Sequence, residues 1–226
     1  MKLKLKLALL PILTLIASTQ ASAGLIEFEP YAGYGLSGKM TATANSGGDG
    51  TFNFSNIGAG ARLNLKPVNF LFLGPDFSYQ MGSSGTYSVT DANYGALSGN
   101  LSKGSLMTVG GVLGFQLPLG IRIWGGYNFM DTNSITQSIS TTVLGQAVSG
   151  TSTNKFSGTT IKVGAGFKLF SVLRLNAEYY MQTYTKVTTS SELSGVTIPE
   201  STTDLSGSDV VKSNLIFLSL SAPLGG

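Results

Sequence analysis

Residues 159–181, TTIKVGAGFKLFSVLRLNAEYYM, decide the fold of this chain. Apolar side chains alternate in this stretch with glycine, lysine, arginine, asparagine and glutamate. In a β-strand, successive side chains point to opposite faces of the sheet. One face therefore carries Ile161, Val163, Ala165, Phe167 and Leu169, and the other carries Lys162, Gly164, Gly166 and Lys168. The stretch predicts two strands that each have an apolar and a polar face and that are joined near residues 170–172.

The first 23 residues are typical of a secretory signal peptide. They contain a basic start with Lys2, Lys4 and Lys6, an apolar core over residues 7–17, and the cleavage pattern Ala21-Ser22-Ala23. The apolar core is too short for a transmembrane anchor, and it contains Pro11. We therefore expect residues 1–23 to be removed and residues 24–226 to form one outer-membrane β-barrel domain.

The composition of the remainder argues against a soluble protein and against a helical membrane protein. Of the 14 basic residues three leave with the signal peptide, so the mature chain is neutral, with 11 acidic residues. A nucleic-acid partner, which requires clustered basic charge, is not expected. Charged residues make up only 11% of the sequence and cysteine is absent. After residue 23, the sequence lacks a run of 18 apolar residues. A transmembrane β-barrel fits this composition.

The alternation recurs along the chain in eight segments, with connections that are alternately long and short. The segments are residues 28–38, 56–66, 70–81, 105–117, 121–130, 161–169, 173–182 and 214–222. In the fifth, we expect Arg122, Trp124, Asn128 and Met130 to share the polar face. In the last, Phe217 is expected there, although Leu215 could shift the phase by one residue. The pattern predicts an all-β, eight-stranded antiparallel up-and-down transmembrane β-barrel with every long connection at one end.

Charge is confined to one of the two faces. The polar face carries Glu27, Glu29, Arg62, Asp76, Arg122, Lys162, Lys168, Arg174 and Glu178, and we expect these residues to form a charge network in the lumen. The apolar face of the eight segments carries none, as hydrocarbon requires. Aromatic residues gather toward both ends of the segments, as in interfacial girdles. A soluble barrel of the lipocalin kind is the alternative, but its outer face would need charge at about a quarter to a third of its positions.

At this point the chain resembles the OmpA and OmpX class of small outer-membrane β-barrels of Gram-negative bacteria, over residues 24 to about 222. The resemblance implies location in the outer membrane, contact with outer-membrane lipid and lipopolysaccharide, insertion by the outer-membrane assembly machinery, a monomer, and loops that face outside. Such barrels usually end on an aromatic residue. This chain ends LIFLSLSAPLGG, so either Phe217 belongs to the assembly signal or that signal is atypical.

Catalytic, cofactor and metal sites are not expected. The chain has no histidine. Outer-membrane barrels that are enzymes resemble one another in using a histidine for proton transfer, so their mechanisms are not expected here. The motif Gly33-Tyr34-Gly35-Leu36-Ser37-Gly38 matches a dinucleotide fingerprint in letters but lies in a predicted strand without a following helix. The stretch NSGGDG at residues 45–50 has one carboxylate, which is too few for calcium. A catalytic carboxylate pair among the lumen acids is the alternative, but salt bridges explain those residues better.

The role is therefore expected to be structural or one of surface interaction. Eight strands enclose a space that side chains can fill. The charges, together with Tyr31, Phe72, Trp124, Tyr180 and Phe217 on the same face, favour a largely plugged lumen. The alternative is a narrow passive channel for small solutes or small apolar molecules, similar to the OmpW type. The connections at residues 84–103, 135–153 and 185–203 are interpreted either as paired ribbons for an extracellular partner or as mobile loops.

Overall fold

The computed structural model describes residues 26–43, 49–68, 70–91, 95–143, 146–170, 172–193, 196–205 and 210–225, so the expected signal peptide lies outside the described residues. The described part is nearly all strand. The strands are β1 (Ile26–Thr43), β2 (Asp49–Val68), β3 (Leu71–Asp91), β4 (Gly95–Gln116), β5 (Ile121–Val143), β6 (Gln146–Phe170), β7 (Leu173–Leu193), β8 (Val196–Asp204) and β9 (Val210–Ser221).

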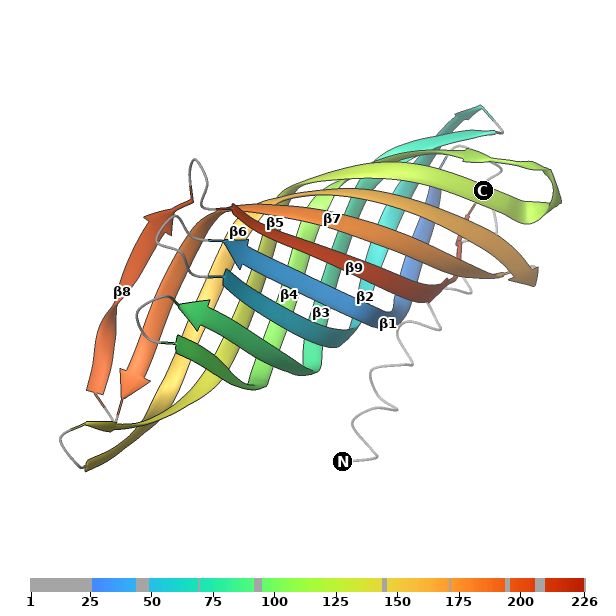
Figure 1. Cartoon of the computed structure of the whole chain (residues 1–226). Helices are drawn as coiled ribbons and strands as arrows, with labels where there is room; N and C mark the ends of the chain where they lie inside the picture. Colours follow the sequence, from blue (N-terminus) through green and yellow to red (C-terminus); the bar gives the residue numbers. More distant parts are fainter. Residues whose placement is uncertain are drawn as a thin grey trace.

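Eight of the strands close into a ring. The antiparallel order runs β1-β2-β3-β4-β5-β6-β7-β9, and β9 pairs back with β1, for example at Ala32 and Leu220. Apart from β8, which lies outside the ring, each strand pairs with the strand before it in the sequence. The ring is therefore a meander. The predicted eight-stranded up-and-down barrel is confirmed. Figure 1 shows the ring, with the long connections at one end, called here the loop end, and the short ones at the other, called the turn end.

The strands are longer than the alternating segments predicted, because they continue into the long connections. Residues 84–103, 135–153 and 185–203 all contain paired strand residues. At the loop end, the ends of β5, β6 and β7 extend past the ring and carry β8 along the free edge of β7 (Figure 1). This extension, called the flap, comprises residues 138–143, 146–151, 186–193 and 196–204, which lie beyond the last pairing of β5 with β4 at Gln137 and of β7 with β9 at Tyr184. Within the described residues these connections are paired ribbons, as one of the two interpretations predicted; their extracellular partner stays a prediction.

The polarity of the barrel is inverted relative to a soluble protein. Ile57 is 56% exposed and Val163 48% exposed on the outer wall, whereas Arg122 on the inner wall is fully buried. The alternation that predicted the two faces holds in β9 as well, where Leu215 and Phe217 point inward. No helix in the described part of the chain is long and apolar enough to cross a membrane.

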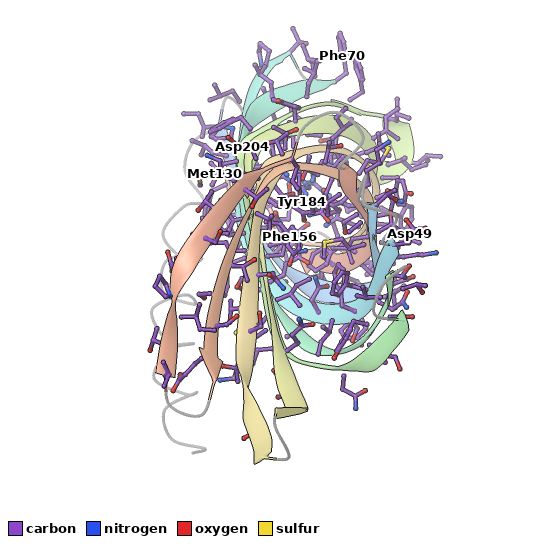
Figure 2. All side chains as sticks on the ribbon, turned by 60° about the vertical axis from the view of Figure 1, so that its left-hand side comes forward. Asp49, Phe70, Met130, Phe156, Tyr184 and Asp204 are labelled. Carbon is purple, nitrogen blue, oxygen red and sulfur yellow. The ribbon has the colours of Figure 1, made fainter. Side chains whose placement is uncertain are left out.

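One residue breaks the predicted alternation. Met130 was expected on the polar face but is exposed on the outer wall, where Figure 2 also shows it. The cause is a β-bulge: the pairing of β5 with β6 jumps from Asn128 to Asp131. Phe129 and Met130 lie opposite the single residue Thr159, so β5 carries one extra residue. Both face outward, and Asp131 takes the inward position.

The turn between β4 and β5 carries a backbone irregularity. A 3-10 turn, η1 (Pro118–Gly120), connects these strands, and Leu119 within it has a φ of 65°. A residue with a side chain rarely adopts this left-handed conformation. The side chain of Leu119 is 87% exposed, so packing does not compensate for the conformation.

Candidate functional site

The turn-end half of the lumen holds a first group of ion pairs around Glu27. The carboxylate of Glu27 lies 3.0 Å from Arg122 Nη1, 3.1 Å from Arg174 Nη1 and 2.6 Å from Lys66 Nζ. Arg122 Nη2 lies 2.5 Å from Glu29 Oε2. Three strands that are not neighbours, β1, β5 and β7, are joined by these bonds. These groups meet because each charged residue occupies an inward-facing position of its strand.

A second group of ion pairs lies farther from the turns. Arg62 Nε is 2.7 Å from Asp76 Oδ1, and Arg62 also pairs with Glu178. Lys162 pairs with the other oxygen of Asp76 and lies 4.0 Å from Glu178. Trp124 Nε1 donates a hydrogen bond of 2.9 Å to Glu178. We call the two groups together the ion network; its residues are Glu27, Glu29, Arg62, Lys66, Asp76, Arg122, Lys162, Arg174 and Glu178.

Aromatic rings stack on the cations of the ion network. The guanidinium carbon of Arg62 lies 4.8 Å from the ring centre of Tyr31 and 4.7 Å from that of Trp124. The guanidinium of Arg122 lies 4.9 Å from the ring centre of Phe72. Cation–π contacts of this kind strengthen when water is excluded. The inward aromatic residues therefore stabilise the charges that they surround.

Glycine leaves the room that this packing requires. A Cβ atom built on Gly164 of β6 would collide with the ring of Trp124, and one built on Gly60 of β2 would collide with the ring of Tyr31. The polar face alternates charged residues with glycine because long side chains from one strand lie over the bare backbone of the next.

Eight of the nine predicted network residues lie together in the lumen, and Lys168 does not. Lys168 is exposed at the turn end of β6. Two residues before the strand ends at Phe170, the alternation no longer determines whether a side chain is buried. The predicted network did not include Lys66, although it continues the alternation of Arg62. Asn64, on the polar face between them, donates hydrogen bonds of 3.1 and 3.0 Å to Glu27 and Glu29.

The middle of the lumen is polar and almost uncharged. Its exception is Asp131, which accepts hydrogen bonds from Thr160 and from Gln182 Nε2, the latter at 2.8 Å. Asp131 is buried, and no basic side chain within the described ranges pairs with it. Sequence reasoning missed this residue because the bulge before it is not encoded by glycine or proline. Nearby buried atoms of Asn128 and Gln80 also lack a hydrogen-bond partner in the described part of the chain.

The loop end of the lumen is filled by apolar side chains. The cluster, called here the apolar cap, consists of Met40, Phe52, Ile135, Phe156, Tyr184 and Val211. The rings of Phe156 and Tyr184 lie 5.7 Å apart, and Figure 2 shows both within the barrel. The cap joins β1, β2, β5, β6, β7 and β9, so six of the eight ring strands contribute to it.

The acids of the ion network are all held in ion pairs, each with at least one cation. The described residues contain no group of three or more acidic, histidine or cysteine side chains placed to hold a metal ion. Gly33 to Gly38 lie within β1, and residues 45–48 of the stretch NSGGDG lie outside the described residues. What the arrangement provides is a rigid link between opposite walls.

Comparisons with known proteins identify the fold. No protein-family profile and no curated protein matches the chain. Among solved structures, it is similar to a major outer membrane protein from Thermus thermophilus, with 15% identity over 89% of this chain and 100% of that chain and a TM-score of 0.53. It is also similar, at lower TM-scores, to two other outer-membrane proteins. OprG from Pseudomonas aeruginosa is 10% identical over 88% of this chain and 96% of its own, with a TM-score of 0.48. The attachment invasion locus protein Ail of Yersinia pestis is 12% identical over 89% and 100%, with a TM-score of 0.42. The chain thus has the fold of the small outer-membrane β-barrel proteins.

Proposed function

We propose that the chain is a non-enzymatic barrel of the Gram-negative outer membrane whose lumen is closed and whose role is structural or lies in surface interaction. The loop end faces outside, and the turn end faces the periplasm. The observation that carries this proposal is that two sets of buried side chains occupy the lumen, one toward each end. The ion network fills its turn-end half, and the apolar cap fills its loop end.

Each closure resists the passage of solutes for a different reason. An ion would have to break buried salt bridges. Each break leaves a charged side chain without its partner in a site with little water. A polar solute would have to cross the contacts between Met40, Ile135 and Phe156 without making hydrogen bonds. Because both barriers lie in series, opening one leaves the lumen closed.

Recording in planar lipid bilayers tests the closed lumen. We expect the folded protein to insert without steady conductance. A double variant, Phe156→Ser with Arg122→Ser, opens both closures and should produce conductance steps if it inserts. Phe156→Ser alone is the matched control and should stay silent. Steady conductance of the wild-type protein would contradict the closed lumen.

A narrow channel is the second candidate, and one observation favours it. Buried atoms of Asn56, Gln80, Asn128 and Gln182 have no hydrogen-bond partner within the described residues. Such atoms in a lumen commonly bind water. The same bilayer recording separates the candidates, because a continuous water path conducts small ions and an isolated wet chamber does not.

The flap is the part of the molecule best suited to a partner. All residues of β8 are exposed, and β8 pairs with β7 alone among the described strands. An unpaired strand edge offers backbone donors and acceptors to an extended segment of another protein. We expect a partner to add a strand at this edge.

Site-specific photo-crosslinking in intact cells tests the edge. A photoreactive residue in place of Ile198 should give a discrete adduct with a protein, and one in place of Leu119 at the turn end should not give the same adduct. Removing residues 188–203 should abolish the adduct without preventing insertion. Removing residues 87–99 from the β3–β4 connection is the matched control. Absence of any adduct from β8 would leave the flap without a partner and contradict its role.

A further inference from the structure

A buried carboxylate and four oxygen-bearing side chains meet in the middle of the lumen. This group, called here the oxygen cluster, consists of Asn128 and Asp131 on β5, Thr160 on β6, and Gln182 and Tyr184 on β7. Each of the five side chains is at most 2% exposed. Register brings them together, because Asn128 and Gln182 both pair with Thr160, and Asp131 and Tyr184 both pair with Gly158. The oxygen cluster therefore lines three adjacent strands at one level of the lumen.

Two β-bulges direct the oxygen cluster into the lumen. The bulge on β5 lies just before Asp131 and turns its carboxylate inward. A second bulge lies on β7, where the pairing with β6 jumps from Tyr184 to Lys186. Both bulges adjoin Gly158, where an added Cβ atom would lie only 2.7 Å from Tyr184 Cα. Bulges re-aim side chains and are frequent next to active sites.

Several oxygens of the oxygen cluster are buried without a hydrogen-bond partner among the described residues. They are Asp131 Oδ1, Asn128 Oδ1, Gln182 Oε1 and the hydroxyl oxygen of Tyr184. The other oxygen of Asp131, Oδ2, accepts from Thr160 and from Gln182 Nε2. The donated hydrogen bond also fixes the amide of Gln182, so that its nitrogen meets the carboxylate and its oxygen stays free.

The charge of Asp131 is not balanced by the ion network. The two hydrogen-bond donors of Oδ2 are neutral, so they orient the carboxylate without cancelling its charge. Lys162, two residues from Thr160 on β6, is held by Asp76. A buried charge without a counter-charge is strongly unfavourable. The oxygen cluster therefore has one negative charge to balance and a set of neutral oxygens beside it.

These features select the class of ligand. Hard metal cations bind oxygen ligands. Neutral carbonyl oxygens replace the hydration shell of a monovalent ion in potassium-selective pores. A single carboxylate balances one positive charge, whereas a divalent ion would leave an excess positive charge in a buried site.

We propose that the oxygen cluster binds one monovalent metal cation, Na⁺ or K⁺, with Asp131 Oδ1 as the charged ligand. The amide oxygens of Asn128 and Gln182 and the hydroxyl of Tyr184 are the neutral ligands. Without the ion Asp131 destabilises the barrel; with the ion it becomes stabilising.

The ion is enclosed when the ring closes. The oxygen cluster lies between the ion network and the apolar cap, to which Tyr184 also belongs. This enclosure rests on the closed lumen proposed above, whereas the binding itself does not.

Retention of rubidium, a monovalent probe, tests the site. The full mature protein is folded into detergent in tetramethylammonium chloride with rubidium chloride, desalted, and analysed for rubidium by mass spectrometry of the elements. The wild-type protein should retain about one ion per chain, and Asp131→Asn should retain less by about tenfold or more. Tyr184→Phe, which keeps the ring in the apolar cap, should also retain less. Asp204→Asn neutralises an exposed acid of β8 and is the matched control, which should retain rubidium as the wild type does.

Thermal unfolding gives a second readout that does not depend on enclosure. At equal ionic strength, rubidium should raise the Tm of the wild-type protein above its value in tetramethylammonium, because the ion binds only the folded state. It should leave the Tm of Asp131→Asn unchanged. The salt dependence of the Tm of Asp204→Asn should match that of the wild type.

The two readouts separate failure of the site from failure of the closed lumen. A wild-type protein that neither retains rubidium nor gains Tm overturns the proposal; a carboxyl group that holds a proton instead of a metal ion gives this result. Equal retention by Asp131→Asn overturns it as well, as does an equal loss in Asp204→Asn. A gain in Tm without retention after desalting supports the site and contradicts the closed lumen alone.

Discussion

Arg122 and Glu29 form a buried ion pair across the full width of the barrel, with 2.5 Å between Nη2 and Oε2. Arg122 lies on β5 and Glu29 on β1, and four steps around the ring separate these strands in either direction. The pair therefore joins directly opposite walls. Lys162 with Asp76 and Arg62 with Glu178 make similar links between strands that are not neighbours.

Replacing Arg122 by Met should destabilise the barrel strongly. The change leaves Glu27 and Glu29 with fewer cations in a buried site, and breaking such a network typically costs about 3 to 5 kcal/mol. Urea unfolding in detergent measures the loss. Lys168→Met, which removes an exposed lysine, should change the free energy of unfolding by less than about 0.5 kcal/mol. Equal effects of the two changes would contradict the assignment of the network.

Two carboxylates should respond to neutralisation in opposite directions. Asp76→Asn removes the partner of Arg62 and Lys162 and should lower the free energy of unfolding by a few kcal/mol. Asp131→Asn removes a buried acid that has no cationic partner among the described residues. In buffer without a small monovalent cation, this change should raise the free energy of unfolding by about 1 kcal/mol. The comparison uses urea unfolding at pH 8. Destabilisation by Asp131→Asn equal to that by Asp76→Asn would imply a bound cation at Asp131.

The packing of glycine against tryptophan can be measured directly by fluorescence. Trp124 is the only tryptophan of the chain. Gly164→Ala forces the ring away from its place, with a cost of about 1 to 3 kcal/mol, and should shift the emission maximum of the folded protein. Gly125→Ala is the control, because the nearest atom to an added Cβ is 4.0 Å away. An unchanged spectrum in Gly164→Ala would show that the ring does not lie over Gly164.

Charge on the outer wall should be tolerated only near the loop end. Val163→Arg places a cation in the apolar band and should cost about 2 to 4 kcal/mol. Ser157→Arg on the same strand lies closer to the headgroups and should cost no more than about 1 kcal/mol. Unfolding from lipid vesicles measures both. A small cost at both positions would contradict a membrane around this wall.

The turn before β5 should gain stability from a residue that tolerates positive φ. Leu119→Asn relieves the left-handed strain at a φ of 65° and removes an exposed apolar side chain, with an expected gain of about 0.5 to 1 kcal/mol. Leu117→Asn, where φ is −89°, should give no such gain. Thermal unfolding in detergent distinguishes the two. A loss of stability in Leu119→Asn would show that this leucine packs against something in the membrane.

The sequence predicted the barrel because every strand follows the same rule: apolar side chains on the outer wall alternate with polar side chains in the lumen. The rule placed Arg62, Arg122 and Glu178 correctly. It left the phase of β9 open, because the inward residues Leu215 and Phe217 are as apolar as the outward ones. It could not place Met130 and Asp131. The bulge turns Phe129 and Met130 outward, and two apolar residues on the outer wall are as acceptable there as one, so the sequence gives no sign of the bulge.

The ends of the strands were harder to predict for a different reason. At Lys168 the strand reaches the turn end, where water is available and burial no longer follows from the alternation. In the flap, the serine and threonine residues suit strands and loops equally well. The pairing of β8 with β7 could therefore be offered only as one of two interpretations.

The long-range character of the ion network dictates how the protein must acquire its structure. Glu27 and Arg174 are 147 residues apart, and Ser221, the last residue of β9, donates to Glu29 from 192 residues away. Partly assembled sheets therefore keep these charges hydrated, and only the meeting of β1 with β9 expels that water. Closure of the seam therefore completes the interior, and contacts of such long sequence separation are slow to form.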